Sequence, residues 1–202
     1  MNHPRELYIF KKYILLMPLL SMTYTLSSCG FNTVVERDEE VKAAWAEISN
    51  QYKRRAELIP NLVEVVKGAA KFEKETLQQV IEARSKVAGI KVDESVLNNP
   101  EMLKAFEAAQ NKLTGALSRL MVVAEQYPDL KASAAYRDLQ AQIEGTENRI
   151  AVARGRFIES VAEYNKVVLR FPSMIGAKMR NKDVRPTFEG NPEQETPPIV
   201  KF

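Results

Sequence analysis

The sequence predicts an all-α protein, an elongated antiparallel up-and-down four-helix bundle with long helices. From Glu36 to Phe171, apolar residues recur every three or four positions, the spacing of one buried face of an α-helix. The breaks between these stretches are short, and long helices joined by short connections pack as antiparallel neighbours. The chain carries neither the alternating apolar pattern nor the Asn-Gly turn that would indicate a β-hairpin.

The first two helices are predicted from apolar stripes on either side of Gly68–Lys74. The first stripe consists of Val41, Trp45, Ile48, Tyr52, Ile59, Leu62, Val66 and Ala69, and the second of Leu77, Val80, Ile81 and Val87. Pro60 falls inside the first stripe. Because proline removes one backbone hydrogen bond of a helix, it predicts either a kink or the start of a new helix there.

The third helix is predicted to begin after a turn between Gly89 and Asn99. In Asn99-Pro100-Glu101 a cap residue precedes a proline at the first helical position, which is typical of a helix start. The apolar stripe that follows contains Phe106, Leu113, Leu117, Leu120, Ala124 and Tyr127. It should stop at Tyr127-Pro128-Asp129, because Pro128 disfavours a helical conformation at the residue before it.

The fourth helix is predicted to be the longest of this region, ending at Phe171-Pro172. Its stripe consists of Leu139, Ile143, Ile150, Phe157, Val161, Tyr164, Val168 and Phe171. At 1.5 Å per residue, its roughly 40 residues would span about 60 Å. The tail from Asn181 contains four prolines, which predicts an extended, weakly ordered segment.

Composition excludes several classes of function. The single histidine is His3 and the single cysteine is Cys29, so no zinc site, internal disulfide or histidine-assisted nucleophile is expected beyond them. Residues 1–28 hold three of the 29 basic and one of the 26 acidic side chains, which leaves 26 basic against 25 acidic residues. This balance argues against nucleic-acid binding. Without a Gly-rich phosphate loop or a nucleophile elbow, we expect no cofactor and no small-molecule substrate.

The N-terminus has the features of an export signal. Basic residues precede a short apolar core at 13–20, and Leu26-Ser27-Ser28-Cys29-Gly30 resembles the bacterial lipobox. In that family of signals the cysteine thiol receives a diacylglyceryl group, the peptide is cut before the cysteine, and the new N-terminus is usually acylated. This interpretation makes residues 1–28 a lipoprotein signal peptide, 29–35 a lipidated tether, 36–180 the bundle and 181–202 a Pro-rich tail. Two alternatives stay open. Because no charge occurs between Lys12 and Glu36, the segment could be an uncleaved membrane helix, or the protein could be exported with Cys29 unmodified.

Several segments together resemble the LemA family. The run Lys53-Arg-Arg-Ala-Glu-Leu-Ile-Pro-Asn-Leu-Val-Glu-Val-Val-Lys-Gly68 is similar to the family signature. Further matches, in family order, are Glu75-Thr-Leu, Ala83-Arg84, Glu125-Gln-Tyr-Pro-Asp-Leu-Lys131, Thr146-Glu-Asn-Arg-Ile-Ala-Val-Ala-Arg154, Tyr164-Asn165, Phe171-Pro172 and Pro198-Ile-Val-Lys-Phe202.

This resemblance implies a four-helix bundle held at a bacterial membrane, without a characterised catalytic activity. It also implies possible partners, either a membrane protease or a TPM-domain protein. The chain departs from the family pattern in two places. It has a lipobox where many members keep a plain membrane helix, and a polar Met179-Arg-Asn-Lys182 where an apolar, aromatic run is usual.

The signature segments contain seven candidate partner-binding residues: Arg54, Arg55, Asn61, Glu147, Asn148, Arg149 and Arg154. Arg54 and Arg55 would pair with Glu47 and Glu57 on a solvated helix face. The alternative is that they recognise an acidic partner or lipid headgroups. Glu147, Asn148 and Arg149 would either form a polar layer inside the bundle or, as a less favoured hypothesis, provide acid–base chemistry.

Two aromatic–proline pairs mark the ends of the last two helices. Tyr127-Pro128-Asp129 and Phe171-Pro172 are interpreted as helix stops whose aromatic rings pack in the core. The alternative is that the two rings form a docking surface.

The predicted function is that of a lipoprotein at the cell envelope, facing the periplasm or the cell exterior. It would bind the lipid bilayer through acylated Cys29 and act as a non-catalytic binding or scaffold module. Two alternatives remain: a structural spacer that self-associates, and a hydrolase that uses Glu147 or Glu125.

Overall fold

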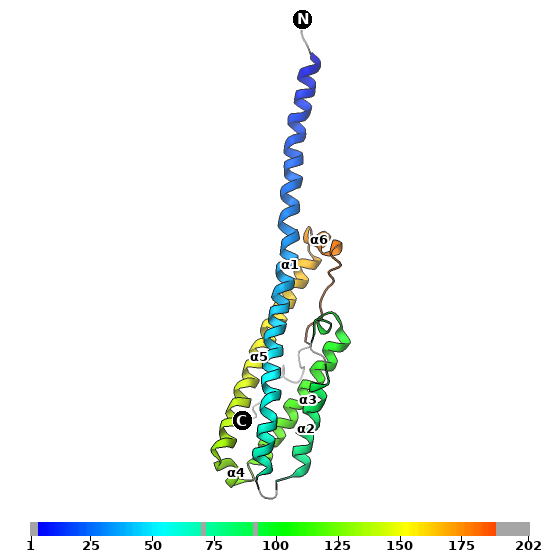
Figure 1. Cartoon of the computed structure of the whole chain (residues 1–202). Helices are drawn as coiled ribbons and strands as arrows, with labels where there is room; N and C mark the ends of the chain where they lie inside the picture. The colour runs from blue at the N-terminus through cyan, green and yellow to red at the C-terminus, as the bar shows by residue number, and fades with distance from the viewer. Residues whose placement is uncertain (1–3, 70–71, 91–92, 189–202) are drawn as a thin grey trace, which may run out of the picture. The chain divides into compact units, whose positions relative to one another are not determined.

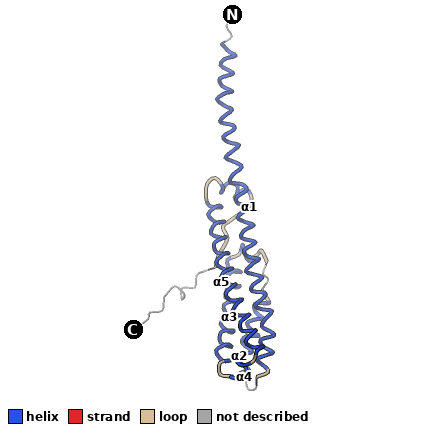
Figure 2. Tube along the Cα trace, turned by 90° about the vertical axis from the view of Figure 1, so that its left-hand side faces the viewer, coloured by secondary structure: helices blue, strands red, loops and turns tan. Residues whose placement is uncertain are grey.

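All regular structure in the described part of the chain is helical. The computed structural model describes the backbone of residues 4–69, 72–90 and 93–188, and the side chains from residue 32 onward. Over these ranges Figure 2 shows helices and loops and no strand. The elements are α1 (Pro4–Lys67), α2 (Lys74–Ala88), the 3₁₀ turn η1 (Val96–Asn98), α3 (Pro100–Ala124), α4 (Pro128–Ala132), α5 (Ala134–Leu169) and α6 (Ser173–Met179). The prediction of an all-α protein is therefore confirmed.

The first helix runs through Pro60 and ends where the sequence predicts a break. α1 comprises 64 residues and continues for seven residues beyond Pro60, whose ring lies on the exposed side. α1 ends at Lys67 and α2 begins at Lys74, as the gap between the apolar stripes predicts. Pro60 therefore does not start a new helix.

The helix starts and stops near the other prolines agree with the sequence only in part. Asn99 caps α3, its side-chain oxygen accepting hydrogen bonds from the backbone N–H groups of Glu101 at 2.9 Å and Met102 at 3.2 Å. α3 ends at Ala124, three residues before the predicted stop. Pro128 then occupies the first turn of the short helix α4, which the sequence analysis missed. The tolerance of proline at a helix start explains this difference.

The chain divides into two compact units. Unit 1 comprises Met1–Val41 and Ala162–Val184, and unit 2 comprises Lys42–Val161 and Arg185–Phe202. α1 and α5 contribute residues to both units. The reason lies in helix length: α2 has 15 residues and α3 has 25, so neither can accompany the 64 residues of α1 throughout.

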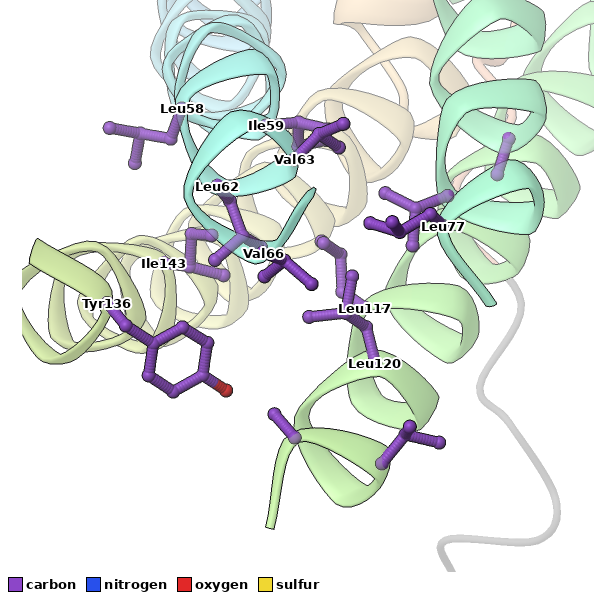
Figure 3. Close-up of a cluster of buried hydrophobic side chains, with 14 of the residues drawn as sticks. Leu58, Ile59, Leu62, Val63, Val66, Leu77, Leu117, Leu120, Tyr136 and Ile143 are labelled. Carbon is purple, nitrogen blue, oxygen red and sulfur yellow. The ribbon is translucent and has the colours of Figure 1, made fainter. Parts of the chain in front are cut away.

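Unit 2 has a continuous apolar core to which α1, α2, α3 and α5 contribute. Figure 3 shows its centre, formed by Leu58, Ile59, Leu62, Val63 and Val66 of α1, Leu77 of α2, Leu117 and Leu120 of α3, and Tyr136 and Ile143 of α5. A second group of rings surrounds Trp45, whose ring centre lies 5.4 Å from those of both Phe106 and Phe157. Of the first predicted stripe, every residue except Ala69 is buried.

Contacts between side chains give the relative directions of helices within unit 2. Along α1, Glu47, Gln51 and Arg55 contact Arg156, Arg149 and Glu147 of α5 in turn, so these two helices run in opposite directions. Along α3, Glu107 contacts Arg154 and Met121 contacts Tyr136, so α3 also runs opposite to α5.

Unit 1 contains the start of α1, the end of α5 and α6. Among its described side chains, Val34, Val41, Tyr164 and Ala177 are buried. The buried carboxylate of Asp38 accepts a hydrogen bond from Nζ of Lys182 at 2.8 Å. The Tyr164 hydroxyl donates to the backbone oxygen of Asp183 at 3.0 Å. These contacts hold the chain after α6 against α1 and α5, and Asn181 turns it with a φ of 51°.

The predicted C-terminal tail begins as an ordered segment. Residues 183–188 are neither helix nor strand, as predicted, but Phe188 is only 3% exposed and packs on Phe157 with ring centres 5.3 Å apart. The prediction of weak order is therefore wrong for this stretch, because the ring of Phe188 packs in the core of unit 2. The rest of the tail, 189–202, lies outside the described residues.

Candidate functional site

Arg55 is the centre of a buried polar cluster that joins three helices of unit 2. It is fully buried, and its guanidinium donates to Glu147 of α5 and to the hydroxyl of Thr114 of α3 at 2.7 Å. The same group donates to the side-chain oxygen of Gln110 of α3 at 2.5 Å. The Arg55 cluster (Arg55, Gln110, Thr114 and Glu147) therefore ties α1, α3 and α5 together. The predicted surface pairing of Arg55 with Glu47 or Glu57 is wrong.

Helical spacing explains why Arg55 points inward. On α1 it lies three residues after buried Tyr52 and four before buried Ile59, so the apolar face of the helix includes its position. A buried guanidinium needs a counter-charge and several acceptors, and Glu147, Gln110 and Thr114 supply them. The guanidinium also lies over the ring of Tyr52, with 5.3 Å between the guanidinium carbon and the ring centre.

A second polar layer lies next to the first, seven residues further along α5 at Arg154 and three residues earlier along α3 at Glu107. Arg154 of α5 donates to Glu107 of α3 at 2.5 Å, and its guanidinium lies 4.3 Å from the ring centre of Phe188. Burial lowers the pKa of Arg154, but its bonds to Glu107 and Tyr52 outweigh burial and raise that pKa above its ordinary value. Arg154 is therefore held charged, and it secures the segment after Arg185 to unit 2.

Tyr52 connects the two layers. Its ring packs edge-on to Phe106 at 5.2 Å between centres and faces Arg55, while its hydroxyl interacts with Arg154. Burial raises the pKa of this phenol above its ordinary value, and the nearby Arg154 and Arg55 only partly oppose the shift. The neutral phenol is thus the form that the folded protein favours.

The raised pKa of Tyr52 predicts a loss of stability in alkali. In the unfolded chain the phenol ionises near pH 10, whereas in the folded protein it keeps its proton to higher pH. The stabilising contribution is therefore complete below about pH 10 and falls as the pH rises further, because the unfolded state then releases the proton first. We expect Tyr52→Phe to flatten the decline of the urea midpoint between about pH 9.5 and 11.5.

Tyr136 is the control for this measurement. Burial raises its pKa as well, with Glu125 and Glu144 contributing in the same direction. Tyr136→Phe should therefore remove a separate part of the decline, and the double variant should show the flattest profile. A Tyr52→Phe protein with the same alkaline slope as the unsubstituted chain would contradict the assignment to Tyr52.

The Ala56 carbonyl and Arg84 form a further contact between α1 and α2. Proline has no N–H, so the carbonyl of Ala56, four residues earlier, lacks its usual helical donor. Nε of Arg84 donates to this carbonyl oxygen at 3.0 Å. The proline in α1 thus creates an acceptor on the helix surface, and α2 supplies the donor.

We expect the substitutions Pro60→Ala and Arg84→Ala to be coupled. In the unsubstituted chain, Arg84→Ala should cost about 1–2 kcal/mol of unfolding free energy, because it leaves the Ala56 carbonyl without its charged donor. In a Pro60→Ala background the helix itself supplies a donor, so the same change should cost about 1 kcal/mol less. Urea unfolding of the four proteins measures this difference, and additive effects would show that the two residues act independently.

Comparison with known proteins places the chain in a family. A model described as the LemA family matches residues 44–202. The chain belongs to the LemA family. It is 30% identical over 144 residues to a protein named LemA from Metamycoplasma hominis, a match that covers 71% of this chain and 58% of that protein.

Two further relatives carry the name of a magnetosome protein. The magnetosome protein MamQ of Magnetospirillum gryphiswaldense is 27% identical over 161 residues, 70% of this chain and 58% of its own length. MamQ 2 of Paramagnetospirillum magneticum is 24% identical over 186 residues, 84% of this chain and 68% of its own. The LemA-family chain therefore spans about 58% of the length of the first two relatives that it matches.

The seven candidate residues of this LemA-family protein do not form one site. Arg55, Glu147 and Arg154 belong to the two internal layers, whereas Arg54, Asn61, Asn148 and Arg149 are exposed. Of these four exposed residues, Arg149 of α5 donates a hydrogen bond to the side chain of Gln51 of α1 at 3.2 Å. The signature segments therefore contribute both an internal network and an outer polar face.

A shallow groove between α3 and α5 reaches the Arg55 cluster from outside. Its volume is about 340 Å³, and its lining includes Thr114, Ser118, Glu144, Glu147 and Asn148. The Glu147 side chain is 30% exposed, whereas that of its partner Arg55 is 1% exposed. Solvent therefore reaches the carboxylate of Glu147 but not its partner Arg55, and Glu147 lines the groove together with Asn148.

The two aromatic–proline pairs have different surroundings. Tyr127 packs on Phe72 with ring centres 4.9 Å apart, and it lines an open hollow of about 490 Å³ with Pro128 and Asp129. Phe171, in unit 1, is 71% exposed. The prediction that the aromatic ring packs in the core is thus confirmed for Tyr127 and wrong for Phe171.

The sequence analysis missed several residues of the polar layers. Glu107, Gln110, Thr114 and Tyr52 belong to these layers, and Arg84, outside them, contacts the Ala56 carbonyl of α1. Gln110 had a usable signal, because it occupies the position between Phe106 and Leu113 in an otherwise apolar stripe. Glu107 precedes Gln110 by three residues and thus lies near the same face.

The two carboxylates considered for hydrolysis are engaged in ion pairs. Glu147 pairs with Arg55, and Glu125 pairs with Lys131 on the surface. Within the residues whose side chains are described, no three of His, Cys, Asp and Glu lie close enough to hold a metal ion. Over the same residues, no helix is sufficiently long and apolar to cross a membrane. The side chain of Cys29 lies outside the described residues.

Proposed function

We propose that this protein is a membrane-anchored lipoprotein that serves as a non-catalytic binding or scaffold module of the LemA type. Acylation of Cys29 would attach the chain to the bilayer on its outer side. Each buried methylene contributes about 0.8 kcal/mol to such an attachment, and two chains suffice for stable anchoring. The helices of unit 2 would form the antiparallel up-and-down four-helix bundle.

The observation that carries this proposal is the internal position of the signature residues. Arg55, Glu147 and Arg154 bind other side chains of the same unit, so they hold helices in register. A scaffold needs such a rigid body, whereas an acid–base enzyme needs an ionisable group that is free to exchange protons. Membership of the LemA family, whose members are not known as enzymes, supports the same choice.

The partner-binding face would consist of the exposed signature residues on α1. Arg54 and Asn61 are both exposed and lie seven residues apart, so they share one face of the helix. An arginine and an amide on a rigid helix would suit an acidic protein surface. A membrane protease or a TPM-domain protein is the expected partner.

Crosslinking in the native cells, followed by mass spectrometry of the membrane extract, tests the proposal. We expect a discrete partner with the unsubstituted chain and its loss with Cys29→Ser, which removes the acylation site. The double variant Arg54→Ala with Asn61→Ala should also lose the partner while remaining folded and membrane-bound. The matched control is Arg119→Ala with Asn111→Ala, since these residues are of the same types and are exposed on α3.

The results also distinguish the alternatives. Crosslinks only between copies of the chain would favour a self-associating spacer. Equal loss of the partner in both double variants would contradict the assignment of the binding face to α1. Catalytic turnover that disappears with Glu147→Gln but survives in the surface variants would overturn the non-catalytic proposal.

A further inference from the structure

Exposed apolar side chains are concentrated at the end of α5 and around α6. Five of the nine exposed large apolar residues in the described part of the chain lie between positions 169 and 184 of unit 1: Leu169, Phe171, Ile175, Met179 and Val184. Phe171 is 71% and Met179 is 74% exposed. Single exposed apolar residues are common on protein surfaces, but a concentrated group marks an interaction site.

Two members of this group share one face of α6. Ile175 and Met179 lie four residues apart within α6, so they are neighbours on the helical surface, and Phe171 lies two residues before the start of this helix. Gly176 and Ala177 lie on the other side of α6 and are buried. The small buried residues thus fix α6 to its unit, and the large apolar ones point away from it. We call Leu169, Phe171, Ile175 and Met179 the α6 patch.

The segment that carries the α6 patch contains basic residues and no acidic ones. No acidic residue occurs between Glu163 and Asp183, whereas this interval contains five basic residues. Lys166 pairs with Glu163 and Lys182 pairs with Asp38. Arg170 and Lys178 are exposed in the same segment. Apolar residues next to basic ones match the acyl region and the anionic headgroups of a bilayer surface.

The position of the α6 patch along α1 agrees with such a surface. Asp38, which holds the segment after α6 through Lys182, follows Cys29 by nine residues of continuous helix. At 1.5 Å per residue this is about 14 Å of α1. Figure 1 shows α6 beside α1 in this unit. A chain attached to a bilayer at Cys29 therefore carries its α6 patch close to the headgroups.

We propose that the α6 patch docks on the surface of an anionic bilayer, with Phe171, Ile175 and Met179 entering the interface and Arg170 and Lys178 facing the lipid phosphates. This inference rests on the proposed anchoring of the chain at a membrane. A second copy of the chain is the less suitable occupant, because a symmetric contact would bring the same basic residues together with no acidic residue of the segment between them.

Tryptophan quenching in vesicles tests the proposal on the full chain. Ile175→Trp places a fluorophore in the α6 patch, and Val122→Trp places one at an exposed apolar position of α3 that is 68% exposed. Both variants are reconstituted into phosphatidylethanolamine and phosphatidylglycerol vesicles, with and without bromine on the acyl chains. Trp45 gives a background that is measured with the unsubstituted chain.

The expected result is selective quenching at the α6 patch. Bromine should reduce the added emission of Ile175→Trp about twofold or more, since an interfacial helix buries its apolar face in the acyl boundary, and should leave that of Val122→Trp unchanged. Substituting Arg170 and Lys178 with Gln should weaken the quenching in anionic vesicles. Equal quenching of the two tryptophans would overturn the proposal.

Flotation of the same vesicles separates this proposal from the anchoring itself. Chains that float with the vesicles but show no quenching of Ile175→Trp would overturn the docking of α6 and leave the anchor intact. Chains that do not float would overturn both. A blue shift of Ile175→Trp that depends on protein concentration and not on vesicles would assign the α6 patch to a second copy, against the proposal.

Discussion

We expect Glu147→Ala to lower the free energy of unfolding by about 3 kcal/mol. Removal of this carboxylate leaves the guanidinium of Arg55 buried without its counter-charge, with only Gln110 and Thr114 as partners. Breaking a buried pair from one side costs about 3–5 kcal/mol, and the lower end applies because the Glu147 side chain is 30% exposed. With a urea m-value of about 1–3 kcal/mol/M, the midpoint should fall by about 1–3 M.

Arg55→Met and Glu144→Ala are the two comparisons that make this prediction specific. Methionine keeps the apolar stem of Arg55 and removes the charge, while Glu147 can then be hydrated from the groove, so a loss of about 1–2 kcal/mol is expected. Glu144→Ala removes an exposed carboxylate on the same helix and should change stability by less than about 0.5 kcal/mol. If Glu147→Ala costs no more than Arg55→Met, the cost does not arise from an isolated buried charge.

The second large effect is expected from Phe157→Ala, which should cost about 3–5 kcal/mol. Phe157 is fully buried between two aromatic neighbours, 5.4 Å from Trp45 and 5.3 Å from Phe188 between ring centres. Its removal leaves a cavity against the single tryptophan of the chain. We therefore expect a lower urea midpoint together with a red shift of the Trp45 emission, because water gains access to the indole.

Ile158→Ala provides the control on the same helix. Ile158 follows Phe157 directly and is 38% exposed, so its truncation should cost about 1 kcal/mol or less and leave the Trp45 emission unchanged. Similar losses for the two variants would contradict the placement of Phe157 at the centre of the aromatic group.

The contrast between Arg54 and Arg55 shows how far sequence reasoning reaches in this protein. Both residues follow the same helical stripe, and both were expected on a solvated face. Only Arg55 is buried, because Glu147, 92 residues further along the chain, and Gln110 supply its counter-charge and acceptors. A single helix cannot reveal such partners, since they come from α3 and α5.

The α6 patch also shows that the sequence does not predict which side chains are buried. The pattern in Phe171-Pro172 indicates a helix stop, and α5 indeed ends at Leu169. Whether an aromatic residue at a helix end is packed or exposed depends on neighbouring elements. Tyr127 meets Phe72, whereas Phe171 is left 71% exposed in its unit.

By itself the sequence determined the helical class, most helix limits, the buried stripes and the family, because these follow from periodicity, proline and cap residues within each local stretch. Tertiary structure alone decided that Arg55 and Arg154 lie in polar layers, that Arg84 bonds the carbonyl released by Pro60, and that Phe188 fills the core. These contacts join residues far apart in the chain, and their free energy depends on burial and partner geometry that arise only when the helices pack.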